Sequence, residues 1–201
     1  MKSLRLLCIG MLAALASGCA HQVSFENIAY GIEGEKQDES LIVVIDSATQ
    51  AQRVPIRSFM TGIAHSWEAE PGAMLKDVAD VEFPQMFSSY RTVSAYQEPP
   101  PGGLTLALTV PSYSFENFHA TVTVHAIAYG PDRSVVLDES YTESGPTQGA
   151  KMFWAGAFGM KSAIRQSSFE AYKTIFESLR ADLSTAVTEQ IPATAPGPRT
   201  P

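Results

Sequence analysis

Cysteine is scarce in this sequence, with only Cys8 and Cys19 among 201 residues. Two cysteines are too few for the disulfide framework that supports small secreted domains. Charged residues are also few, at 17%, while 45% of the residues are hydrophobic. This balance excludes an intrinsically disordered chain and is typical of one folded domain with a sizeable core.

Basic residues are in the minority, because 14 Lys and Arg face 21 Asp and Glu, for a net charge of −7. Affinity for nucleic acid comes from Lys and Arg that neutralise phosphates, so we expect no nucleic-acid partner.

A long hydrophobic run is missing as well. The apolar run at residues 6–16 is shorter than the roughly 20 residues that span a bilayer.

The first 18 residues have the layout of a signal peptide that ends at a lipid-modified cysteine. Lys2 and Arg5 precede the apolar run, and the small residues 16–18 precede Cys19. We therefore expect acylation of Cys19 and anchoring of the chain to a membrane; an ordinary signal peptide with an incidental cysteine is the alternative. Ala20, in place of Asp, resembles the sorting signal for the bacterial outer membrane, with the domain facing the periplasm.

Cleavage before Cys19 would remove Lys2, Arg5 and Cys8 and change the net charge from −7 to −9. No thiol would remain, which excludes a Cys nucleophile and a thiolate metal site. Residues 19–40 carry acidic residues and glycines and are expected to form a flexible tether. Residues 191–201 hold four prolines and are expected to be a disordered tail, which leaves a single domain at 41–190.

Alternation of apolar and polar residues predicts most of the strands. It is clearest at residues 104–110, where Leu and Val alternate with Thr and Ala, and residues 121–129 and 134–142 form the next two strands around a turn. Short connections between these strands favour antiparallel pairing. Weaker or shorter strand signals lie at residues 41–45, 54–63 and 91–96.

Two segments have the 3.6-residue periodicity of amphipathic helices. The first covers residues 71–89, with an interruption at Pro84. The second begins at Ser167, which with Glu170 fits a capping box. Its apolar stripe consists of Phe169, Tyr172, Phe176, Leu179, Leu183 and Val187. The fold class expected is α+β, with a mixed, mostly antiparallel sheet packed against these two helices.

The order of these features is similar to small bacterial outer-membrane lipoproteins of the YajG type. It resembles more loosely the auxiliary lipoproteins of ABC transport systems. Four segments carry the resemblance: residues 15–19, 103–113, 120–141 and 167–187. The resemblance implies an α+β domain with helices on one face of a mixed sheet, and no enzymatic activity.

One segment between the last strand and the last helix is unusually rich in large apolar residues. Its members are Met152, Phe153, Trp154, Phe158 and Met160. One interpretation is a loop that folds under the last helix and completes the core. The other is an apolar patch that contacts a partner protein or the membrane surface, where Trp, Phe and Met are enriched.

Residues that could carry catalysis or metal binding form no recognisable motif. The histidines are His21, His65, His119 and His125, and no ligand spacing connects them. Asp138 and Glu139 are adjacent on a strand and therefore point to opposite faces. We expect no metal and no cofactor. A hydrolase would need a buried Ser–His–carboxylate cluster around His125 or His65.

The function expected is that of a non-catalytic, lipid-anchored accessory or assembly factor of an envelope complex for transport, secretion or polysaccharide export. It would dock through a sheet edge or the apolar segment. The alternative is a periplasmic carrier of a small apolar ligand. An unfilled cavity lined by Leu104, Leu106, Leu108 and Phe176 would favour the carrier.

Overall fold

The computed structural model of the chain describes residues 21–56 and 66–190. The expected signal peptide, Cys19, His65 and the proline-rich tail lie outside the described residues. The side chains at 150–158, 189 and 190 lie outside them as well, although the backbone there is helical.

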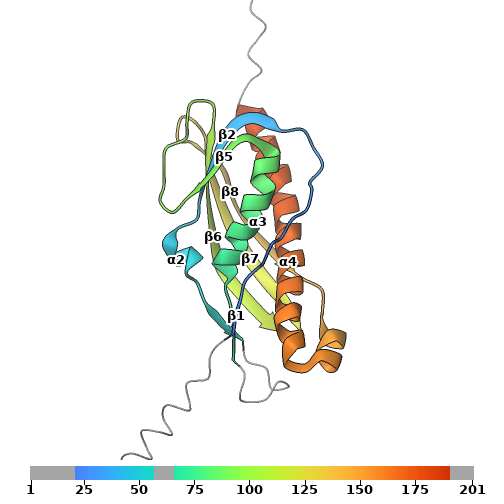
Figure 1. Cartoon of the computed structure of the whole chain (residues 1–201). Helices are drawn as coiled ribbons and strands as arrows, with labels where there is room; N and C mark the ends of the chain where they lie inside the picture. Colours follow the sequence, from blue (N-terminus) through green and yellow to red (C-terminus); the bar gives the residue numbers. More distant parts are fainter. Residues whose placement is uncertain (1–20, 57–65, 191–201) are drawn as a thin grey trace, which may run out of the picture.

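Two mixed sheets and three helices make up the described part of the chain, which confirms the α+β class (Figure 1). The larger sheet has the order β5-β2-β6-β7-β8, with parallel pairing from β5 to β6 and antiparallel pairing from β6 to β8. Its strands are β2 (Gln37–Val44), β5 (Phe87–Val93), β6 (Leu104–Glu116), β7 (His119–Tyr129) and β8 (Val135–Ser144). The smaller sheet has the order β1-β4-β3, from β1 (His21–Val23), β4 (Trp67–Ala69) and β3 (Val54–Ile56).

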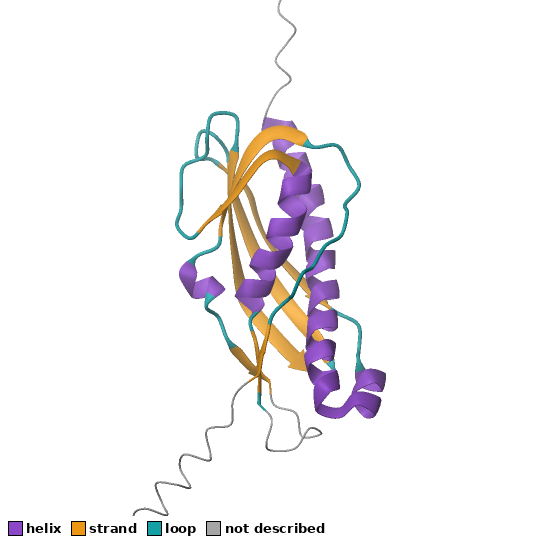
Figure 2. Ribbon diagram, in the orientation of Figure 1, coloured by secondary structure: helices purple, strands orange, loops and turns teal. Residues whose placement is uncertain are grey.

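The alternating pattern of the long strands decides which face of the large sheet is buried. Leu106 and Leu108 of β6 lie opposite Ala128 and Ala126 of β7, and all four side chains are fully enclosed. The long helices α3 (Pro71–Met86) and α4 (Gly149–Gln190) cover this face, and no helix of the described residues lies on the other (Figure 2). A short third helix, α2 (Ser47–Gln50), begins at Asp46, whose carboxylate accepts a hydrogen bond from Thr49 N.

The expected interruption at Pro84 is wrong, because α3 continues through it to Met86. A proline removes one backbone donor, and so close to the end of a helix this costs a single hydrogen bond. The chain then enters β5 directly at Phe87, so this strand covers 87–93 rather than the expected 91–96.

The last helix begins at Gly149, so the capping box at Ser167 is wrong, and so is the interpretation of the apolar segment as a loop. Ser167 lies in the middle of α4, where its hydroxyl accepts a hydrogen bond from Ala120 N at 2.8 Å. The predicted apolar stripe is confirmed, since Phe169 is partly buried and its other five members are at most 7% exposed. In Figure 1 the first turns of α4 lie at an angle to its long part.

The expected tether is wrong from His21 onward, because these residues are part of the domain. β1 pairs with β4, and Val23 and Phe25 are 0% and 7% exposed. Residues 24–36, which we call the strap, then cross α3 and α4 on the side away from the large sheet and lead into β2 (Figure 1). Their apolar residues are scattered among polar ones, so no periodicity predicted this packing.

Candidate functional site

The end of the chain that would carry the lipid leads directly into the fold. β1 begins at His21, so Ala20 is the one residue between it and Cys19. His21 N donates to Ser66 O at 2.9 Å, and the His21 ring lies 4.9 Å from that of Trp67. An acyl chain on Cys19 would therefore be joined to strand β1 through Ala20 alone.

The apolar segment is part of helix α4, and Met160 is the one member whose side chain the structure describes. Met160 is 1% exposed and belongs to the hydrophobic core, so a role for it in partner or membrane contact is wrong. The side chains of Met152, Phe153, Trp154 and Phe158 lie outside the described part of the structure, and their contact role stays a prediction.

A buried carboxylate fastens the strap to both long helices. Glu82 of α3 is 1% exposed and accepts hydrogen bonds from Tyr30 Oη at 2.8 Å and from Arg180 Nη1 at 3.0 Å. Gln85, one turn further along α3, accepts from Ile32 N and donates to Tyr30 O, both at 3.0 Å. The strap is thus held at its backbone and at one side chain.

Burial raises the pKa of the Glu82 carboxyl above its ordinary value, although the Tyr30 hydrogen bond and the Arg180 charge both act to lower it. Burial and the nearby Glu82 charge raise the pKa of the Tyr30 hydroxyl. Perturbed acids of this kind can mark reactive sites. Here both carboxylate oxygens have protein partners, so the arrangement is suited to holding the strap and leaves no free oxygen for proton transfer.

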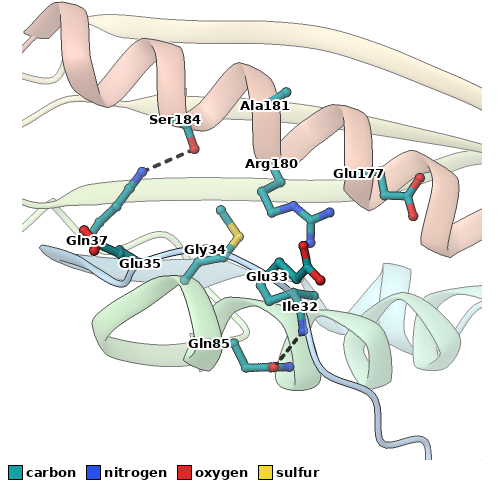
Figure 3. A pocket seen from close by; sticks show the side chains of 11 residues that line it. Ile32, Glu33, Gly34, Glu35, Gln37, Gln85, Glu177, Arg180, Ala181 and Ser184 are labelled. Carbon is teal, nitrogen blue, oxygen red and sulfur yellow. Dashed lines mark hydrogen bonds between the residues drawn. The ribbon is translucent and has the colours of Figure 1, made fainter.

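A hollow of about 250 Å³ lies beside this ion pair, between the strap and the two helices (Figure 3). Arg180 reaches into it from α4, while Gln37 Nε2 donates to Ser184 Oγ at 3.3 Å across its far end. Glu33, Glu35 and Glu177 also line it. These charges make it unsuitable for a small apolar molecule.

A second hollow, of about 470 Å³, lies where the beginning of the strap meets α4. Glu26 forms ion pairs here with Lys161, at 3.3 Å, and with Arg165. These cations lower the pKa of the Glu26 carboxyl, chiefly through their hydrogen bonds. Arg165 Nε also donates to Ser24 O at 2.8 Å, so the polar wall of this hollow ties the strap to the helix.

The residues proposed for an apolar ligand cavity belong to the hydrophobic core. Leu104, Leu106, Leu108 and Phe176 are 0–3% exposed. None of them lines either of the two hollows. The geometry therefore gives the carrier alternative no support.

His125 pairs with Asp138 on the helix-free face of the large sheet. His125 Nε2 lies 2.8 Å from Asp138 Oδ1, and the two side chains are 33% and 59% exposed. The register places Asp138 opposite Ile127 and Glu139 opposite Ala126, which confirms that the two acids point to opposite faces. The pair is solvated rather than buried, unlike the cluster that a hydrolase would need.

Within residues 21–56 and 66–190, no three His, Cys, Asp or Glu side chains are grouped so that they could hold a metal ion. Over the same ranges, no helix combines the length and apolarity needed to cross a membrane.

No family model and no curated protein matches the sequence. The solved structure of a hypothetical protein from Chlamydia trachomatis is similar, with a TM-score of 0.43 and 8% sequence identity. The similarity covers 75% of this chain and 98% of that chain. A likeness of this size supports no statement about function.

Proposed function

We infer that this chain is a non-catalytic, lipid-anchored accessory or assembly factor at the periplasmic face of the bacterial outer membrane. The observation that carries the proposal is the position of Cys19, which follows a signal-like segment and is separated by Ala20 alone from a strand of the folded domain. Acyl chains on Cys19 would confine the domain to the membrane and raise its effective concentration toward partners there.

We propose β8, one of the two edge strands of the large sheet, as the docking element for such a partner. It forms one edge of the large sheet and is therefore available for pairing with an extended segment. Its acidic residues are Asp138, Glu139 and Glu143, and it contains no Lys or Arg. These charges disfavour pairing with β8 of a second copy and favour a partner segment that carries basic residues.

Labelling with palmitate tests the anchor, and the second cysteine supplies a matched control. We expect the label in the wild-type chain and in Cys8→Ala, and its loss in Cys19→Ala, because Cys8 would leave with the signal peptide. Absence of label from the wild-type chain, together with unchanged behaviour of Cys19→Ala in cells, would contradict the proposal.

Affinity capture from outer membranes tests the accessory role. We expect the wild-type chain to co-purify with components of one envelope complex, and Cys19→Ala to lose them. A basic substitution in the docking strand, Glu139→Lys, should weaken capture without affecting palmitate labelling. Capture that is the same with and without the acyl chain would contradict the role assigned to the anchor.

A further inference from the structure

The short connection between Cys19 and β1 decides which end of the domain meets the membrane. Only Ala20 lies between Cys19 and His21. Their Cα atoms are therefore two steps apart along the chain, at most about 7 Å at about 3.6 Å per step. This step rests on the acylation of Cys19 proposed above. Acyl chains so close to β1 would bring that end of the molecule against the bilayer.

The first turns of α4 lie at this same end of the molecule (Figure 1). Ion pairs of the following turns of α4 support this placement near β1. Lys161 and Arg165 both pair with Glu26, which lies three residues after the end of β1. Residues 149–158 would therefore start close to the bilayer surface, and at about 1.5 Å per residue they form about 15 Å of helix.

The sequence of these turns suits a membrane interface better than the start of an ordinary helix. Four large apolar residues, Met152, Phe153, Trp154 and Phe158, accompany one charged residue, Lys151. Helix dipoles favour acidic residues in the first turn, yet α4 has none there, and none precedes Glu170. Aromatic residues combined with Lys are typical of helices that lie in the interface of anionic lipid.

We propose that residues 149–158 of α4 lie in the interface of the phospholipid bilayer that holds Cys19. The helix would act as a second contact beside the acyl chains and fix the orientation of the domain on the membrane. The contact ends before Gly159 and Met160, because both are buried in the domain. Interfacial helices sit with their apolar side about 5–10 Å into the boundary between headgroups and acyl chains.

Tryptophan fluorescence can test this depth, because the chain has only Trp67 and Trp154. Trp67 is 5% exposed in the domain, so Trp67→Phe leaves Trp154 as the reporter and Trp154→Phe is the matched control. Both full-length, acylated proteins are reconstituted in vesicles of phosphatidylethanolamine and phosphatidylglycerol, with and without brominated acyl chains.

We expect Trp154 emission to shift to the blue on vesicles and to be quenched by bromine near the headgroup end of the acyl chains. Trp67 pairs with His21 at the same end of the molecule, but its side chain is only 5% exposed, so its emission in Trp154→Phe should be quenched less than that of Trp154. If Trp67→Phe does not fold, the Trp154 signal is obtained as the difference between the wild-type chain and Trp154→Phe.

Two outcomes would overturn the inference and are distinguishable. If the acylated protein floats with vesicles but Trp154 is no more quenched than Trp67, the anchor stands and residues 149–158 face something else, such as a protein partner. If Cys19 carries no acyl chain, the proposed function fails and the inference fails with it.

Discussion

Arg180 compensates the charge of a carboxylate that is almost fully enclosed. Replacing Arg180 with Met keeps an apolar stem of similar length and removes the charge and the 3.0 Å hydrogen bond to Glu82. Removing one partner of a buried pair typically costs about 3–5 kcal/mol. The Arg180 side chain is 28% exposed and Tyr30 still donates to Glu82, so we expect a loss in the free energy of unfolding at the low end, about 3 kcal/mol near pH 8.

The same substitution should make stability depend more steeply on pH. The Arg180 charge lowers the pKa of Glu82, so its removal raises that pKa further above the unfolded value of 4.5. Between the unfolded and the folded pKa, the folded state binds more protons, and stability falls as pH rises. The loss caused by Arg180→Met should therefore be smaller near pH 5 than near pH 8.

Urea unfolding followed by far-UV circular dichroism at both pH values measures this difference. Arg133→Met is the control, because Arg133 pairs with Glu98 and both side chains are 65% exposed; we expect a loss below about 1 kcal/mol. The double variant Glu82→Leu/Arg180→Met should recover part of the loss, since it leaves no charge buried. A loss below about 0.5 kcal/mol for Arg180→Met near pH 8 would refute the reasoning.

Three further variants test the packing. At Gly72 a Cβ atom would come 1.7 Å from Thr49 O, so Gly72→Ala should lower the free energy of unfolding in urea by about 3 kcal/mol. Gly31→Ala is the control, because a Cβ atom there would have nothing within 4 Å, and it should change the free energy of unfolding by less than about 0.5 kcal/mol. Trp67→Phe should be nearly neutral in thermal unfolding, because the indole Nε1 is buried with no partner in the described structure; a loss above about 2 kcal/mol would argue against this. Tyr30→Phe should cost about 1.5–3 kcal/mol through its hydrogen bond to the buried carboxylate, and an unchanged unfolding midpoint would contradict that role.

The regular part of the fold could be predicted from the sequence because its signal is local. Alternation in residues 104–110 placed β6, and the stripe containing Tyr172 and Phe176 placed the second half of α4. In both cases, the residues that share a face follow directly from the period of the backbone. The start of α4 was missed because a serine hydroxyl can cap a helix, and the sequence pattern favours Ser167 as the N-cap. In the structure, this hydroxyl instead accepts a hydrogen bond from Ala120 N of the neighbouring strand β7.

The strap could not be predicted, because its contacts connect residues far apart in sequence. Tyr30 and Glu82 are 52 residues apart, and neither carries a local pattern that indicates the other. One signal was present: Glu82 occupies a position that continues the apolar stripe of Met74, Leu75 and Val78. A carboxylate on an otherwise buried face requires a partner. The predicted acylation of Cys19 differs from the strap, because it depends on local sequence alone. Cys19 lies outside the described residues, so the structure does not test this prediction.

The packed strap limits how far an anchored domain can reach. A free tether over the 17 residues 20–36 would extend up to about 3.3 Å per residue and would let an anchored domain move about 56 Å from the membrane. With β1 paired and the strap held by Glu82 and Gln85, that freedom is lost, and the reach is set by the domain itself. The 42 residues of α4 correspond to about 63 Å of helix at most, including the angled first turns. If Cys19 is acylated as proposed, a partner would have to offer its binding segment within about that distance of the bilayer, and we would expect a membrane-embedded or membrane-adjacent complex.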